Sequence, residues 1–261
     1  MRDFYATDTA PLDQAHGLRR LFAASRQRFV PLAANPHVPF SGVVIDELTA
    51  AFVQRGQRVL VVDAADGAPA PREISLLDLG AGIEDLSPQI GYLAARGLPL
   101  RHVDTRGSAS AFVDALAQAA PKADVVLVHA NPGDLARMFG QRAARPILIG
   151  ADHPESIKHA YAACKLLAQR CGLMTFDLVL AAPLASRRVR AIASSLASCA
   201  DAFLGALLHD WAVVDPATDL RAGPDAAVAR LVGGQLALDA AGFAGPAAVA
   251  GFAPPVSATT N

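Results

Sequence analysis

The sequence of 261 residues is long enough for one large α/β domain or two small ones, and 52% of its residues are hydrophobic. A charged fraction of 18% with a net charge of −1 excludes a disordered chain and gives no electrostatic reason to expect nucleic acid as a direct partner. No run approaches 18 uninterrupted apolar residues, and the first residues lack an apolar signal core, so we expect a cytoplasmic protein.

Residues 1–27 are predicted to form an amphipathic helix followed by a polar linker. Apolar side chains recur three and four positions apart, and Asp13 is one candidate for the N-cap. The apolar positions are Leu12, Ala15, Leu18, Leu21 and Phe22. Such a helix either packs on its own domain or enters a groove on another protein.

Residues 28–239 alternate between strand and helix patterns, which predicts a mainly parallel sheet with helices on both faces. We expect strands at 29–33, 59–63, 100–103, 124–128, 146–149, 176–181 and 210–214. We expect helices at 43–55, 87–96, 110–119, 155–171, 186–202 and 224–239. Residues 240–261 are rich in Gly, Ala and Pro and are expected to form a flexible tail.

The first βαβ unit, residues 29–66, resembles the phosphate-binding start of a P-loop ATPase, but it lacks the side chains that hold phosphate. A functional loop has several glycines, a lysine that binds the β- and γ-phosphates, and a Ser or Thr that binds Mg²⁺. Here the loop reads Asn35-Pro36-His37-Val38-Pro39-Phe40-Ser41-Gly42, and the chain has no lysine before Lys122. Ser41 lies one residue from the hydroxyl position, Gly42 retains one glycine, and Asp63 ends the second strand.

Several motifs resemble those of the FlhG/FleN family, MinD-like ATPases that control flagellar number and placement. Asp13-Gln14-Ala15-His16-Gly17-Leu18-Arg19 is similar to that family's N-terminal Asp-Gln-Ala-x-x-Leu-Arg motif. The stretch from Pro154 to Tyr161 is similar to the family's Thr-Pro-Glu-Pro-Thr-Ser-Ile-x-x-Ala-Tyr. The resemblance spans roughly residues 12–235 and implies a P-loop NTPase fold of the MinD/ParA type.

The same resemblance indicates four places at which nucleotide contacts are lost. The phosphate loop lacks its lysines, Ala65 replaces the second aspartate after the second strand, and His129 replaces the switch aspartate. Ala181-Ala182 stands where the family has an adenine-contacting Asn. We therefore expect no cofactor, because phosphoryl transfer depends on positioning and charge neutralisation by such groups.

In the family, the N-terminal helix stimulates the signal-recognition-type GTPase FlhF. The resemblance therefore implies partner contacts through Asp13, Gln14, Ala15, Leu18 and Arg19, with a flagellar transcriptional regulator or switch-complex proteins as further partners. It also implies recruitment to the cell pole or flagellar base. Membrane association is doubtful, because the chain after residue 240 contains no basic residue.

Two other functions stay open at this point. The chain could be an active ATPase that binds ATP and Mg²⁺ through an atypical loop, or a MinD-like regulator of cellulose secretion, pilus placement or partition. Two local patterns also allow two interpretations. Leu77–Ile83 is either a switch motif, which it resembles, or a loop that begins a helix. His129 and His153 either form a metal-binding or acid–base pair or have a structural role. The three cysteines, which lack metal-ligand spacing, are expected to be free thiols.

Overall fold

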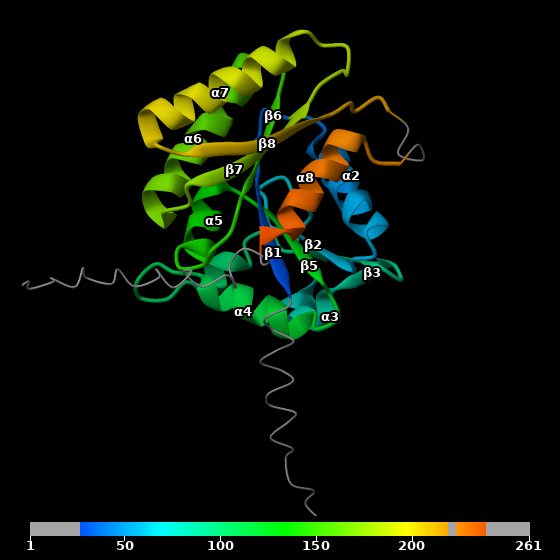
Figure 1. Ribbon diagram of the computed structural model, residues 1–261. Coiled ribbons are helices and arrows are strands. Elements are labelled where there is room, and N and C mark those ends of the chain that lie inside the picture. The colour runs from blue at the N-terminus through cyan, green and yellow to red at the C-terminus, as the bar shows by residue number, and fades with distance from the viewer. Residues whose placement is uncertain (1–26, 219–222, 239–261) are drawn as a thin grey trace, which may run out of the picture.

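The computed structural model describes residues 27–218 and 223–238. Within these ranges a single sheet of eight strands runs in the order β3-β4-β2-β5-β1-β6-β7-β8 (Figure 1). All neighbouring strands are parallel except β3 and β4, which form an antiparallel pair at one edge. The expected mainly parallel sheet is therefore confirmed.

The strands are β1 (Arg28–Ala33), β2 (Val59–Asp63), β3 (Glu84–Ser87), β4 (Ile90–Ala94), β5 (Val125–Ala130), β6 (Ile147–Ala151), β7 (Thr175–Ala181) and β8 (Leu207–Val214). The helices are α2 (Ser41–Gln54), α3 (Leu79–Gly82), α4 (Ser110–Ala119), α5 (Pro132–Phe139), α6 (Pro154–Cys171), α7 (Arg188–Leu204) and α8 (Ala226–Leu236). Two 3₁₀ turns complete the described part, η1 (Glu73–Leu76) and η2 (Pro99–His102). None of the helices in these ranges is long and apolar enough to cross a bilayer.

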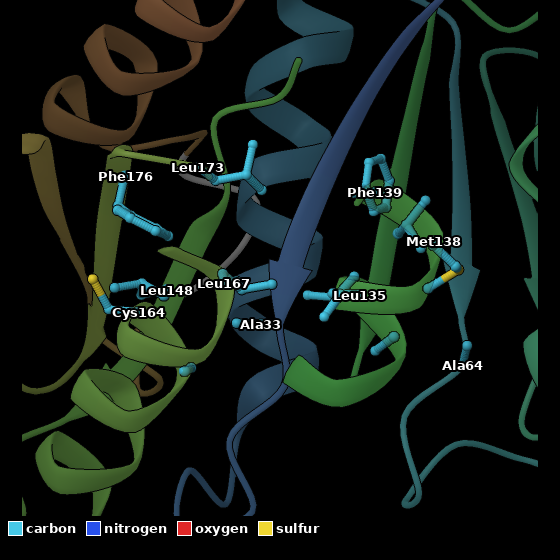
Figure 2. Packing of buried hydrophobic residues seen from close by; sticks show 14 of the residues in the cluster. Ala33, Ala64, Leu135, Met138, Phe139, Leu148, Cys164, Leu167, Leu173 and Phe176 are labelled. Atoms are coloured by element: carbon cyan, nitrogen blue, oxygen red, sulfur yellow. The ribbon is translucent and has the colours of Figure 1, made fainter. Parts of the chain in front are cut away.

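Helices cover both faces of the sheet, and each face has its own core. On one face, residues of α2 and α8 pack against alternate positions of the strands, such as Val30 and Leu32 of β1. On the other face, α4, α5, α6 and α7 supply Leu135, Phe139 and Leu167, among others. In Figure 2, Leu167 lies by Leu148 and Ala33 of the sheet, and Phe139 lies next to Met138. The central strands are buried on both sides, which explains their continuous apolar runs.

The expected order of elements is wrong in the stretch between β2 and α4. Residues 87–96 were expected to be a helix, but they contain the end of β3, a turn at Pro88–Gln89 and the strand β4. Pairing of β4 with the edge of β2 accounts for this difference, since tertiary pairing overrides local propensity. The expected strand at 100–103 is also wrong: η2 occupies it, with Leu100 53% exposed outside the sheet.

Candidate functional site

The loop between β1 and α2 lies at the carboxyl ends of the central strands, where open α/β sheets bind their ligands. This loop occupies the position of the phosphate loop in P-loop ATPases. Its last residue, Phe40, is the N-cap of α2, makes no side-chain cap and is 57% exposed. Ser41 and Gly42, the two candidate residues in the loop, form the first turn of α2, and the space around Gly42 is open.

Asn35 fixes this loop to the neighbouring strand and helix. Its side chain is buried, and its amide nitrogen Nδ2 donates to the Ile149 carbonyl oxygen at 2.8 Å and to the Ser156 carbonyl oxygen at 2.9 Å. Nδ2 also lies 3.0 Å from the Ser156 hydroxyl, which in turn accepts the backbone N–H of Ala151. Since β1 pairs with β6 only as far as Ala33 and Leu148, the Asn35 amide continues the contact between the two strands by side-chain bonds.

The backbone N–H groups that would hold phosphate are lost or used within the loop. Pro36 and Pro39 have no N–H to donate. The N–H of His37 donates to the Asn35 Oδ1 at 3.1 Å, and the N–H of Val38 donates to the Asn35 carbonyl oxygen at 3.0 Å. Only the start of α2 retains donors that lack a partner within the helix, as every helix start does.

Asp63, the third candidate residue, ends β2 beside β5 and contacts the residue that replaces the switch aspartate. Its Oδ1 lies 2.8 Å from the Nδ1 of His129, and it also accepts the backbone N–H of Ala65 at 3.3 Å. His129 is 5% exposed, and its Nε2 is buried without a hydrogen-bond partner. The carboxylate that would bind Mg²⁺ through a water or directly is therefore engaged by an imidazole.

No lysine among the described residues compensates for the missing one. Lys158 and Lys165 both lie on α6, which follows β6 rather than the loop after β1, and Lys158 is paired with Glu155 at 2.7 Å. Lys122 precedes β5 and lines a hollow at the opposite, amino-terminal edge of the sheet together with Arg58. Taken with the loop and Asp63, these positions do not fit Mg-ATP bound as P-loop ATPases bind it.

The space beside the loop is lined mostly by apolar residues, together with His37, Asp152 and His153. A cavity of about 450 Å³ at the carboxyl edge is lined by Phe40, Pro183 and Pro216, with Ala181 and Ala182 where the family's adenine contact was expected. Next to it, the rings of His37 and His159 meet edge to face, with centroids 5.9 Å apart. Burial lowers the pKa of His159 below its ordinary value. This burial favours the neutral imidazole of His159. The cavity is also lined by Asp152, an acidic side chain that does not attract a triphosphate.

The possible metal pair and the possible switch motif are not formed. His129 lies within β5 and His153 follows β6, two strands that are separated by β1, and His153 is exposed at the N-cap of α6. In the described ranges, no three His, Cys, Asp or Glu side chains gather in a way that could hold a metal ion. Asp78 caps the short helix α3 by accepting the N–H groups of Gly80 and Ala81. Leu77–Ile83 is therefore a turn that begins a helix.

The cysteines are free thiols, as expected. Cys164 is buried, and burial raises its pKa to about 12. A thiol with so high a pKa is a poor nucleophile at neutral pH.

The remaining candidate residues lie outside the described part of the chain. These are Asp13, Gln14, Ala15, Leu18 and Arg19, so their role stays a prediction. The structure adds Asn35 and His129 as residues that organise the site. The signal for Asn35 was present in the Asn-Pro dipeptide, which favours a side chain that bonds to its own turn.

No family model matches the sequence, and no curated protein matches it either. The structure is similar to a chain of the MinC:MinD cell division protein complex of Aquifex aeolicus, with a TM-score of 0.55 at 12% identity over 84% of this chain and 98% of that chain. It is also similar to the ParA family ATPase of Chlorobium tepidum, with a TM-score of 0.53 at 11% identity over 80% and 97% of the two chains.

A third similar structure is the cobyrinic acid a,c-diamide synthase of Mycobacterium smegmatis, with a TM-score of 0.54 at 19% identity over 85% of this chain and 99% of that chain. These identities are too low to transfer an activity, and what they share is the architecture. The chain has the P-loop NTPase fold of the MinD and ParA ATPases.

Proposed function

We propose that this chain is a MinD-fold regulator that has lost ATPase chemistry and acts by contacting other proteins. The observation that supports the proposal best is the engagement of the former nucleotide groups with one another. Asn35 uses the loop N–H of His37, and His129 uses the Asp63 carboxylate. A triphosphate would have to break both contacts without a lysine to neutralise its charge.

Titration calorimetry with Mg-ATP and Mg-ADP on the full-length protein tests this first part. We expect no binding heat at nucleotide concentrations up to the millimolar range. Micromolar affinity with ATP-dependent dimerisation would instead establish the alternative, an active ATPase with an atypical loop. Asp63→Asn is the matched variant. In an active ATPase this change would weaken Mg-ATP binding, whereas in this protein we expect no binding heat either with or without the change.

The finer part of the proposal is a flagellar role like that of FlhG/FleN, and it rests on the sequence between Asp13 and Arg19. In this proposal the segment stimulates an FlhF-type GTPase, and the α/β body contacts other flagellar proteins at the cell pole or flagellar base. The test is GTP turnover by FlhF with the full-length protein, the Gln14→Ala variant and the Arg19→Ala variant.

We expect stimulation by the unchanged protein and its loss in both variants. Gln89→Ala is the control, since Gln89 is an exposed turn residue between β3 and β4. Absence of stimulation, or stimulation that Gln14→Ala leaves intact, refutes the activator role. The regulator of another surface assembly system, such as cellulose secretion or a pilus, would then be the better proposal.

A further inference from the structure

A second surface, distant from the former nucleotide site, combines arginine side chains with exposed apolar ones. It surrounds a cavity of about 560 Å³ at the amino-terminal edge of the sheet. We call it the arginine groove and define it by three arginines and three apolar residues: Arg28, Arg142, Arg145, Phe29, Leu173 and Met174. Among the described residues that line this cavity, none is acidic.

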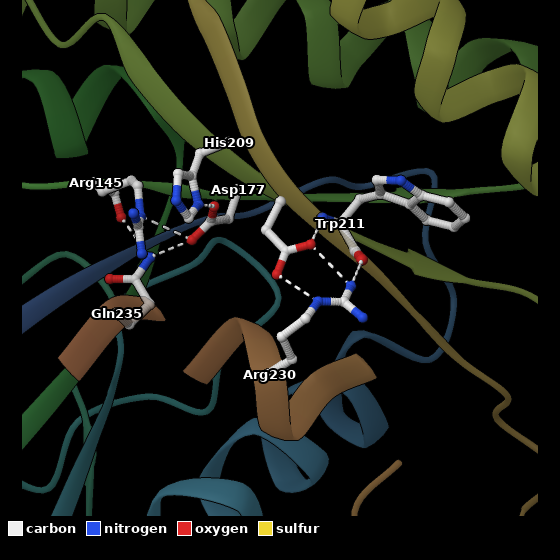
Figure 3. Close-up of polar contacts among 7 residues, drawn as sticks. Arg145, Asp177, His209, Trp211, Arg230 and Gln235 are labelled. Atoms are coloured by element: carbon white, nitrogen blue, oxygen red, sulfur yellow. Dashed lines mark hydrogen bonds and ion pairs between the residues drawn. The ribbon is translucent and has the colours of Figure 1, made fainter. Parts of the chain in front are cut away.

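The arginines are held in place by the fold. Arg145 is 5% exposed and lies with its Nε 2.9 Å from the Oδ2 of Asp177, a carboxylate that is fully buried on β7. Gln235 of α8 donates to the same carboxylate at 2.8 Å and to the Arg145 carbonyl oxygen at 3.0 Å, while His209 approaches it at 3.2 Å (Figure 3). Such a network fixes the guanidinium before any partner arrives, which lowers the entropy lost on binding.

The other two arginines differ in how they are held. Arg28 donates from Nη2 to the carbonyl oxygen of Leu236 at 3.0 Å, near the end of α8. Arg142 follows α5 and pairs with Asp114, whose side chain is 61% exposed. An exposed pair of this kind is weak and can exchange its carboxylate for one on a partner. Arg142 is therefore the arginine that is best suited to bind a carboxylate from outside.

Exposed apolar side chains extend the groove along one side. Met174 is 40% exposed, Leu207 59% and Phe203 76%. Leu207 lies beside Met174, because its N–H donates to the Met174 carbonyl oxygen at 2.8 Å, and a Cβ on Gly205 would lie 3.9 Å from the Met174 methyl group. Phe203 is in the last turn of α7, two residues before Gly205. Apolar side chains gathered on a surface and bordered by arginine are typical of protein interfaces, where arginine and aromatic residues contribute most of the binding energy.

From this combination we infer that the arginine groove docks a segment of a partner protein that presents one or two carboxylates beside large apolar side chains. The exposed apolar side chains favour large apolar side chains on the partner, and Arg142, which can exchange the exposed carboxylate of Asp114 for another, favours a negative partner. The inference goes beyond the proposed function and is independent of the nucleotide site and of residues 1–26. Its test therefore can fail without affecting the earlier proposal.

The test selects random displayed peptides on the immobilised full-length protein and measures the affinity of the enriched peptides by fluorescence anisotropy. We expect them to contain Asp or Glu near Leu, Phe or Trp. Arg142→Glu should weaken their binding by about tenfold or more, and Phe203→Ala should weaken it severalfold, because both residues are partly or largely exposed and their loss leaves the core intact. Arg142→Gln should have an intermediate effect.

Arg106→Glu is the charge-matched control, because Arg106 is exposed on the loop after η2 and does not line the groove. It should change the affinity by less than about twofold, because it alters the net charge by the same amount without changing a lining residue. Raising the salt from about 0.1 M to about 1 M, where the Debye length falls from about 10 Å to about 3 Å, should weaken the unchanged protein's binding. The inference is overturned if no peptide is enriched, if the enriched peptides lack carboxylates, or if Arg142→Glu and Phe203→Ala leave their binding unchanged.

Discussion

Replacing Asn35 tests whether its side chain fixes the former phosphate loop. In Asn35→Ala, the carbonyl oxygens of Ile149 and Ser156 each lose a donor, and the N–H of His37 loses its acceptor. The two carbonyl contacts are buried, and each buried group left without a partner costs about 1–3 kcal/mol. Because the Ser156 carbonyl also lies within α6, we expect the free energy of unfolding to fall by about 2–4 kcal/mol in total.

Asn35→Asp is the matched variant, because it keeps the shape of the side chain but cannot donate when ionised. The new carboxylate would face two carbonyl oxygens in a buried place, and both effects raise its pKa in the folded protein. Below the unfolded-state pKa of about 3.9 the new side chain is protonated in both states and does not disfavour folding. As the pH rises through the higher folded-state pKa, the free energy of unfolding falls. Asn35→Asp should therefore be less stable than Asn35→Ala at pH 7 and recover toward mildly acidic pH.

Urea unfolding provides the assay, with the fluorescence of Trp211, the chain's only tryptophan, as the signal. The m-value should be unchanged, so that a shift in midpoint reports stability. A loss below about 0.5 kcal/mol in Asn35→Ala would refute the reasoning, since such a value is typical of surface positions. A pH-independent difference between the two variants would also refute it.

Three further predictions concern the surroundings of the site and the sheet. The pKa of His159 is lowered in the folded protein, so its contribution to stability is complete above about pH 6.5 and is lost as the pH falls through the lower folded-state pKa. His159→Gln should therefore show a smaller loss of stability than the unchanged protein between about pH 7 and pH 5 in urea unfolding. Asp177→Asn should lower the free energy of unfolding by about 3–5 kcal/mol, because Arg145 remains as a buried charge, whereas the double change Asp177→Leu with Arg145→Met should restore much of it. Gly82→Ala should destabilise the protein by about 1–3 kcal/mol, because its Cβ would lie 2.0 Å from a serine Oγ, while Gly67→Ala, with open space around it, should be nearly neutral in the same thermal unfolding experiment.

Most of the strands that the sequence indicated correctly are buried on both faces, and the partly exposed edge strand β8 is the exception. Val125–Ala130 is buried at every position, so its apolar run stands out against any helix pattern. Glu84–Ser87 and Ile90–Ala94 are partly exposed and short, and β4 is a strand because the edge of β2 was free to pair with it. The residues of β4 do not themselves indicate that the edge of β2 is free, which explains why a helix was expected there.

The candidate site shows the same limit. The loss of lysine and glycine from the loop was readable from residue types, as was the His at position 129. The contact between Asp63 and His129 was not, because it depends on the register that places these two residues opposite each other on β2 and β5. No role was expected for Asn35, whereas the structure makes it the anchor of the loop.

The sheet edges restrict how the chain can contact other proteins. Both edge strands carry a bulge, at Leu86 in β3 and at His209 in β8, and bulges disfavour strand addition. On β8 the backbone groups of Trp211 are also occupied, since Asp210 accepts the N–H of Trp211 at 2.7 Å and Arg230 donates to the Trp211 carbonyl oxygen at 3.1 Å. A partner that cannot extend the sheet must bind side chains. The polar groups of the former nucleotide site are already bonded to each other, so we expect a partner to bind where a weak, exposed ion pair such as that of Arg142 lies beside exposed apolar side chains, at the amino-terminal edge.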